Sequence, residues 1–191
     1  MDGSQICLLI VLLILVAFSA LFSSTETAYS SVNMIRLKQM AKNGDKRART
    51  AYSISKNFTA AITTILIGNN VVNILATSIA TELFTQMFGS AGVAVATGIM
   101  TVLILTFGEI TPKIVAKAKA ESVALFMAKP LSIMVLLFRP ISFVVESIEA
   151  HWEKKMEIEN VTATEDELLE IVSTIEQEGV LEQEERELIE S

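Results

Sequence analysis

Residues 91–113 read AGVAVATGIMTVLILTFGEITPK, and this stretch decides the fold class. The part that ends at Phe107 carries no charge, and with the residues that follow it is long enough to cross a bilayer as a helix. A carboxylate, Glu109, then stands at the end of the apolar run. A charge at membrane depth costs about 3 kcal/mol or more unless it is paired or faces a cavity. The stretch therefore predicts a transmembrane helix that ends in a functional group.

The last six of these residues, Gly108 to Lys113, combine that carboxylate with a helix-breaking proline. In an α-helix, Pro112 provides no N–H to the carbonyl four residues earlier, which is that of Gly108. Glycine has no side chain to screen this oxygen. A free carbonyl beside a carboxylate is chemistry that hard cations bind. The alternative is that Glu109 only pairs with Lys113, its i+4 neighbour.

The chain as a whole is too apolar for an ordinary soluble domain, because hydrophobic residues make up 51% of its 191 residues. Its net charge of -7 hides a division, since 13 of the 22 acidic residues lie from Glu157 onward, where Arg186 is the single basic one. The part before Glu157 is net positive. The lone cysteine, Cys7, excludes an internal disulfide. The sequence contains no nucleophile–base set or phosphate loop, so we expect neither an enzyme nor a nucleic-acid partner.

The hydropathy pattern predicts three transmembrane spans, at about residues 4–30, 58–88 and 91–118. A signal peptide is disfavoured for the first, because Met1–Gln5 carries Asp2 and no positive charge. Basic residues follow the first and third spans, and the positive-inside rule puts both regions in the cytoplasm. We therefore expect a multi-pass protein of the cell membrane with an outside N-terminus and a cytoplasmic C-terminus. The basic residues are Arg36, Lys38, Lys42, Lys46, Arg47, Arg49 and Lys56 after the first span, and Lys113, Lys117 and Lys119 after the third.

Residues 122–158 are apolar but contain Lys129-Pro130 and Arg139-Pro140. These pairs cut the segment into pieces, and the uninterrupted run Leu131–Phe138 is too short to span a bilayer. We expect a bent amphipathic juxtamembrane belt at the inner interface, where Lys129 and Arg139 reach lipid headgroups. The alternative is a fourth span, which would carry the acidic tail outside.

Residues 159–191 return to a soluble, acidic pattern. Thr164 to Glu167 has the form of a capping box that opens a helix, apolar residues follow at helical spacing, and Gly179 is a stop signal. We expect a small cytoplasmic acidic helical bundle. The chain ends inside this bundle or just after it, as expected of a fragment of a longer protein. The predicted fold is thus an all-α polytopic membrane protein with a transmembrane domain at 1–121, the juxtamembrane belt at 122–158 and the acidic bundle at 159–191.

Three groups of oxygen-bearing residues lie within the predicted spans, and no His or Cys accompanies them. Hydroxyl, amide, carbonyl and carboxylate oxygens suit Mg2+, Ca2+ or Na+ rather than zinc or copper. Counting along the helices puts Ser23 and Glu109 near the cytoplasmic face and the asparagines nearer the middle, which leaves open whether the groups meet. The alternatives are interhelical hydrogen bonds for the serines and asparagines, and an ion pair between Glu26 and the basic loop. The groups are Ser19, Ser23, Ser24 and Glu26; then Asn69, Asn70 and Asn73; then Gly108 and Glu109 with Pro112 and Lys113.

Three motifs occur in an order that is typical of a known family: FSSTETA at residues 22–28, GNNVVNI at 68–74 and GEITPK at 108–113. Together they resemble the transmembrane domain of the CorC/CNNM family of magnesium transporters, and residues 165–189 resemble the acidic helical bundle that follows that domain. The resemblance covers nearly the whole chain. It implies three transmembrane helices, a juxtamembrane belt, a homodimer in the lipid bilayer and Mg2+ export coupled to Na+.

The resemblance also implies an ion site, which we expect to lie between the helices in a cavity open to the cytoplasm. By motif, its ligands are Ser23, Asn70 or Asn73, the Gly108 carbonyl and Glu109, with Pro112 as the helix breaker. From the residues themselves we expect support from Ser19, Ser24, Glu26, Asn69 and Lys113. Family members continue into paired CBS domains that bind ATP. Nothing in this sequence matches those domains, so regulation by ATP is not expected of this chain. Two rival functions stay open: transport of another ion, Na+ or H+, by Glu109, and a membrane sensor or scaffold that transports nothing.

Overall fold

The computed structural model describes residues 2–156, and the side chains of residues 2–145, 147 and 148. Within residues 2–156 every regular element is a helix, which confirms the predicted all-α class of a polytopic membrane protein. Two compact units divide the chain, Met1–Ser147 and Ile148–Ser191. The features considered below belong to the first unit, except the last residues of α7, from Ile148 to Met156. The acidic bundle predicted at residues 159–191 lies outside the described residues.

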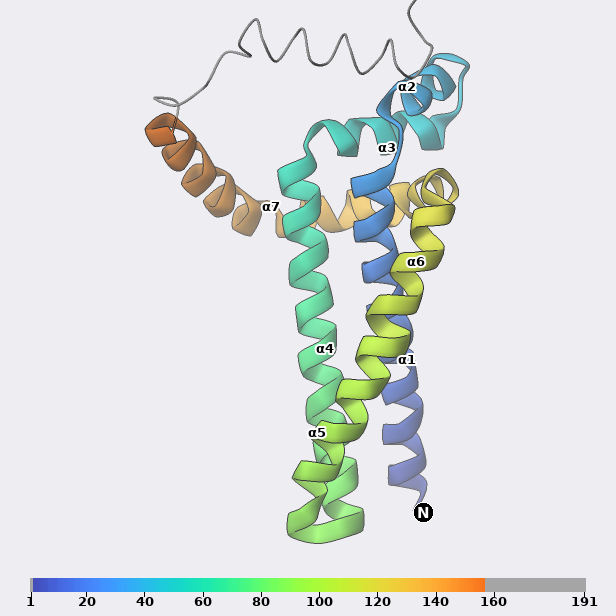
Figure 1. Ribbon diagram of the computed structural model, residues 1–191, viewed down its shortest axis with the longest axis vertical. Helices are drawn as coiled ribbons and strands as arrows, with labels where there is room; N and C mark the ends of the chain where they lie inside the picture. The colour runs from blue at the N-terminus through green and yellow to red at the C-terminus, as the bar shows by residue number, and fades with distance from the viewer. Residues whose placement is uncertain (1, 157–191) are drawn as a thin grey trace, which may run out of the picture. The chain divides into compact units, whose positions relative to one another are not determined.

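Three long helical runs correspond to the three predicted spans. They are α1 (Gly3–Ser31), α4 (Phe58–Phe88) and a run composed of α5 (Gly92–Leu103), η2 (Ile104–Ile110) and α6 (Thr111–Ala118). Figure 1 shows α4 and α5 joined as a hairpin at one end, from which α4 and α6 diverge toward the other end. Helix α1 packs against α4, η2 and α6, so one face of α1 receives residues from both legs of the hairpin.

Glycines make the hairpin turn tight. Helix α4 ends at Gly89, whose φ of +61° lies in the left-handed region that favours glycine. The short helix η1 (Gly89–Ala91) then leads to Gly92, where a Cβ would lie only 2.4 Å from the backbone oxygen of Phe84. Without a side chain at residue 92, the backbones of α4 and α5 can approach closely enough to pack as antiparallel neighbours.

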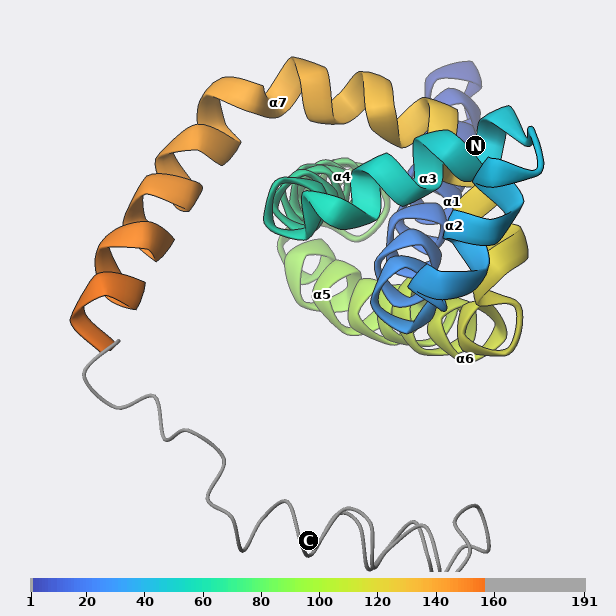
Figure 2. The ribbon, with the colours of Figure 1, turned by 90° about the horizontal axis from the view of Figure 1, so that it is seen from above.

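The basic segment between the first two spans forms two amphipathic helices, which the sequence analysis treated only as a connection. They are α2 (Met34–Lys42) and α3 (Lys46–Lys56), visible from above in Figure 2. Each begins with a side-chain cap: Asn33 Oδ1 accepts from the N–H of Ile35 at 3.0 Å, and Asp45 Oδ1 accepts from the N–H of Arg47 at 2.7 Å. Their buried faces contribute Leu37, Ala48, Ala51 and Ile54 to the core.

Helix α7 (Ala120–Met156) corrects the expectation that prolines cut residues 122–158 into pieces. Pro130 and Pro140 both lie inside one continuous helix. Each removes only one helical hydrogen bond, and the intact turns on either side hold the helix together. By length and composition alone, Ala120–Val145 is one of three candidate membrane-crossing stretches in the described chain, beside Gly3–Ser31 and the hairpin Phe58–Ala118.

The first half of α7 nevertheless lies across the bundle. Figure 1 shows it running transverse to α1 and α4, and in Figure 2 it passes along one side of them. Tyr29 Oη of α1 donates a hydrogen bond to the carbonyl of Ala124 at 3.1 Å, and Ala128 and Leu131 join the same core. Phe126, Ile133, Leu136 and Leu137 are exposed on the other face. This geometry supports a helix that lies at the membrane interface.

Two apolar clusters hold the bundle together, one toward each end. The cluster next to α2, α3 and α7 includes Phe22 of α1 and Ile65 of α4. The cluster next to the hairpin turn includes Leu12 of α1 and Ala76 of α4. Both contain several alanines, as expected where helices associate inside a bilayer by close packing. A layer of polar groups around Ser19 of α1, Asn69 of α4 and Gly108 of η2 lies between the two clusters, and we call it the polar layer.

Candidate ion site between helices α1, α4 and η2

A buried hydrogen bond joins α1 to α4 in the polar layer. Ser19 Oγ donates to Asn69 Oδ1 at 3.2 Å, and Ser19 is completely buried. Gly108 of η2 lies on the other side of the same serine, because a Cβ at residue 108 would come within 2.9 Å of Ser19 Oγ. Both Ser19 and Gly108 lie about 24 Å along their helices from the hairpin end, at 1.5 Å per residue. Tertiary packing therefore brings residues from all three predicted groups together around Ser19.

Two further polar atoms of this layer are buried without a partner. Ser23 Oγ, one helical turn after Ser19, makes no hydrogen bond, and neither does Asn73 Oδ1, one turn after Asn69. A buried polar atom left unpaired costs about 1–3 kcal/mol. Such atoms in a native protein usually hold a water molecule or an ion. Because α1 and α4 run in opposite directions, Ser23 lies about 6 Å from the Ser19–Asn69 bond toward α2 and α3, and Asn73 lies about 6 Å from it toward the hairpin.

The GEITPK stretch departs from the α-helix on which the sequence argument relied. Residues 104–110 form a π-helix, and the N–H of Thr111 bonds to the carbonyl of Thr106, five residues earlier. In the π register an N–H at residue 112 would bond to the carbonyl of Phe107, and in the α register it would bond to that of Gly108. Because Pro112 has no N–H, it donates to neither carbonyl. We therefore expect two neighbouring carbonyls, those of Phe107 and Gly108, to lack the bond from residue 112. The discontinuity lies at a π-turn next to a proline, where helices commonly change register.

The two acidic residues of the site have different surroundings. Glu109 is half-buried, and within residues 2–148 it makes no ion pair. Lys113, the pairing partner considered for it, instead has its Nζ 3.1 Å from Glu26 Oε2. The alternative that Glu109 is neutralised by Lys113 is therefore wrong for this conformation. Glu26 does pair with a lysine, but with one from α6 and not from the basic segment that follows α1.

The remaining predicted residues lie at the edge of this layer. Ser24 Oγ is 3.5 Å from the carbonyl of Pro112, a long contact that joins α1 to α6. Asn70 is exposed, because it points about 100° away from Asn69 around α4. The structure thus brings Ser19, Asn69 and Gly108 into contact, and leaves Asn70 on an outer face.

Sequence reasoning missed one contact that shapes the site. Phe22 of α1 packs its ring on Gly68, where a Cβ would lie 2.5 Å from the ring carbon Cε1. The ring therefore fixes the separation of α1 and α4 one residue before Asn69. The sequence signal for this contact was a glycine that directly precedes two asparagines in an apolar run. Only the structure of α1 shows that this glycine makes room for the ring of Phe22.

The chemistry of the donor set suits a hard cation. The described residues contain no cluster of three or more His, Cys, Asp or Glu side chains. The polar layer contributes hydroxyl, amide and backbone carbonyl oxygens, and Glu109 follows Gly108 directly in the chain. Neutral oxygens with one carboxylate are typical of Mg2+ or Na+ sites and not of zinc or copper sites.

The chain has apolar helices of membrane length, and they enclose a buried polar layer. These features define a polytopic membrane protein with an intramembrane polar site. The chain belongs to the CNNM family: the model of the Cyclin M transmembrane N-terminal domain matches residues 9–185. This confirms the resemblance that the three motifs indicated. The family is linked to magnesium transport in general.

Curated relatives agree with this assignment. A UPF0053 protein of Haemophilus influenzae is 36% identical over 170 residues, which cover 87% of this chain and 40% of the relative. The UPF0053 inner membrane protein YfjD of Escherichia coli is 40% identical over 121 residues, 62% of this chain and 28% of the relative. A chloroplastic DUF21 domain-containing protein of Arabidopsis thaliana is 35% identical over 185 residues, 95% of this chain and 28% of the relative. The chain therefore spans well under half the length of these relatives.

Proposed function

We propose that this chain is the membrane domain of a Mg2+ transporter, and that the cation binds in the polar layer between α1, α4 and η2. Ser23, the Gly108 carbonyl and Glu109 are the proposed ligands, and Asn73 lies on the other side of the Ser19–Asn69 bond. Ser19 and Asn69 support them through their hydrogen bond. The protein acts as a transporter and not as an enzyme.

The observation that carries this proposal is the buried hydroxyl of Ser23, whose Oγ has no partner, one turn from the contact between Ser19 and Gly108. Asn73 Oδ1 is also buried without a partner, but α1 and α4 run in opposite directions, so it lies about 12 Å from Ser23 along the bundle, on the other side of the Ser19–Asn69 bond. Mg2+ gives up its waters reluctantly, so a site that dehydrates it needs several fixed oxygens. The unpaired state of Glu109 supports the proposal, because its charge is available to a cation.

The direction and partners of transport extend the proposal. The basic residues on α2, α3 and α6 favour a cytoplasmic location for that end of the bundle, in the cell membrane. We propose Mg2+ export from the cytoplasm coupled to Na+, by a homodimer, as the family resemblance implies. Paired CBS domains, which bind ATP in the family, would belong to a longer protein.

Calorimetric titration of Mg2+ into the purified protein in detergent tests the site. Ser23→Ala should weaken binding about tenfold or more, because it removes one of a few fixed ligands. Ser55→Ala is the matched control, since Ser55 Oγ on α3 is also buried without a partner but lies apart from the polar layer. Equal effects of the two changes would contradict the site.

Flux measurements in proteoliposomes test the function itself. Mg2+ movement that Glu109→Gln abolishes and Glu82→Gln preserves supports the proposal, since Glu82 is an exposed carboxylate on a membrane helix. Movement of Na+ or H+ without Mg2+ would favour another ion as the cargo. If the protein binds Mg2+ but moves no ion, the sensor or scaffold function is favoured.

A further inference from the structure

A pocket of about 370 Å³ lies where α1, α2, α6 and α7 meet, at the end of the bundle that carries α2 and α3. Four helix ends form it: α1 ends at Ser31, α2 starts after Asn33, α6 ends at Ala118 and α7 starts at Ala120. Its volume is within the range of about 300–1,000 Å³ that small-molecule sites occupy. We call it the junction pocket. It is separate from the polar layer, and none of the proposed ion ligands lines it.

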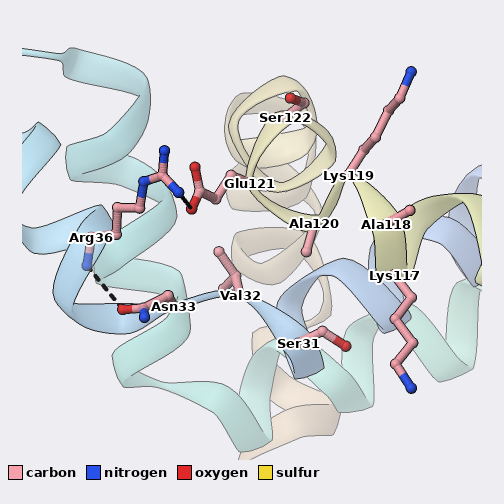
Figure 3. A pocket seen from close by; sticks show the side chains of 10 residues that line it. All are labelled: Ser31, Val32, Asn33, Arg36, Lys117, Ala118, Lys119, Ala120, Glu121 and Ser122. Atoms are coloured by element: carbon pink, nitrogen blue, oxygen red, sulfur yellow. Dashed lines mark hydrogen bonds and ion pairs between the residues drawn. The ribbon is translucent and has the colours of Figure 1, made fainter.

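The lining of the junction pocket is net positive. Arg36 pairs with Glu121 at 3.0 Å, which leaves Lys117 and Lys119 as uncompensated charges. Within residues 2–148, neither lysine has a carboxylate within ion-pairing distance. Figure 3 shows the Arg36–Glu121 pair on one side of the pocket and the two lysines on the other. The pocket therefore favours an anion over a neutral or cationic ligand.

The side chains around the pocket can adapt to a ligand. Lys117 and Lys119 are exposed, and in Figure 3 their side chains point away from the Arg36–Glu121 pair in two different directions. Their flexible stems let them rotate toward a bound anion. A lysine ammonium on its flexible stem binds phosphate as a mobile point charge. The exposed hydroxyl of Ser122 is a further donor at the pocket wall. Glu121 is the one acid present, and its ion pair with Arg36 compensates its charge.

The position of the pocket at the start of α7 indicates that the pocket lies at the depth of the lipid headgroups. Helix α7 starts at the pocket and runs across the bundle, with Phe126, Ile133 and Leu136 exposed on its outer face. Such residues on an interfacial helix insert among the upper parts of the acyl chains. The charged groups at the start of the same helix then lie beside the phosphates of that leaflet.

We propose that the junction pocket binds a phosphate-bearing anion, which can be presented by an acidic phospholipid of the adjacent leaflet or by a soluble phosphate. Lys117 and Lys119 provide the charge, and Ser122 provides a hydrogen bond. A ligand at this place would contact α1, α6 and α7 together, and so would tie the interfacial helix to the membrane bundle.

The test uses the purified protein in micelles of a neutral detergent, with dihexanoyl phosphatidylglycerol, dihexanoyl phosphatidylcholine and inorganic phosphate as three separate probes. The double variant Lys117→Gln/Lys119→Gln should weaken binding of the anionic probe about tenfold or more, since each basic residue contributes a factor of about five at an anionic surface. The control Lys38→Gln/Lys42→Gln removes the same charge from exposed positions of α2 outside the pocket, and should change binding less than about twofold.

A second variant fills the pocket without changing its charge. Ala118→Leu adds volume at an exposed lining position and should also weaken binding. Tighter binding of phosphatidylglycerol than of inorganic phosphate identifies the lipid as the source, and the reverse identifies a soluble phosphate. The proposal is overturned if neither anionic probe binds, if phosphatidylcholine binds as tightly as phosphatidylglycerol and inorganic phosphate does not bind, or if the control variant loses as much affinity as the pocket variant.

Discussion

Lys113 Nζ lies 3.1 Å from Glu26 Oε2, and this ion pair ties α6 to α1 beside the polar layer. Both side chains are partly exposed, so the pair contributes little to stability by itself. Its consequence for the site is larger. Lys113 is the i+4 neighbour of Glu109, and as long as Glu26 holds the lysine, the Glu109 carboxylate stays unpaired.

Glu26→Gln should therefore lower the affinity for Mg2+ without removing a ligand. The released Lys113 can pair with Glu109 along the helix, and a cation would then have to displace it. We expect a loss of about two- to fivefold, from the energy of an i,i+4 ion pair that is partly shielded from water. Calorimetric titration measures it. The double variant Glu26→Gln/Lys113→Gln should recover the affinity, and Glu121→Gln, which breaks the ion pair between Arg36 and Glu121, is the control. No recovery in the double variant would show that Glu26 acts in another way.

Pro112→Ala tests the discontinuity in the third membrane run. The new N–H can bond to the carbonyl of Phe107 or Gly108, and either bond withdraws an oxygen from the polar layer. Affinity for Mg2+ should fall several-fold, about 1 kcal/mol for one hydrogen bond that competes with the cation. Pro130→Ala provides the comparison, since it restores an N–H inside α7, away from the layer. If Pro112→Ala binds Mg2+ like the natural protein, the carbonyl argument is wrong.

Ser19→Ala should destabilise the bundle by about 1–2 kcal/mol, because it leaves Asn69 Oδ1 buried without a donor. Thermal unfolding in detergent, followed by circular dichroism, measures the change. Ser78→Ala is a suitable control: its hydroxyl is exposed on the same helix as Asn69 and bonds only to the carbonyl of Ile74, one turn back. A destabilisation no greater than that of the control would mean that the Ser19–Asn69 bond does not join the helices.

Gly68→Ala should destabilise the protein by about 1–3 kcal/mol through overpacking, since the new methyl group would overlap the ring of Phe22. The ring is buried in the cluster next to α2, α3 and α7, so it can shift only by disturbing its neighbours. Gly98→Ala is the matched control, because a Cβ at that position of α5 meets nothing within 4 Å, and alanine favours the helix. The same thermal unfolding experiment compares them. Combining Gly68→Ala with Phe22→Leu should relieve part of the loss, and equal melting of the two glycine variants would contradict the packing argument.

The sequence alone determined which segments of this protein lie in the membrane. Inside a bilayer every backbone N–H and C=O must be satisfied within the segment itself, so an apolar run of sufficient length has to be a helix. That local rule predicted helices at the positions where α1, α4 and the α5–α6 run lie. The three polar motifs were equally visible, because an amide or a carboxylate in such a run is costly and stands out.

Only the tertiary structure decided which members of these motifs meet. The register of α1 against η2 puts Ser19 on Gly108, and the rotation of α4 turns Asn69 inward and Asn70 outward. These choices depend on contacts such as Phe22 on Gly68, between residues far apart in the chain, which no local pattern contains. The same holds for Lys113: its spacing favoured Glu109, but the closeness of α1 gave it Glu26 instead. Periodicity describes one helix at a time, whereas a site between helices is set by how their side chains fill the space that they share.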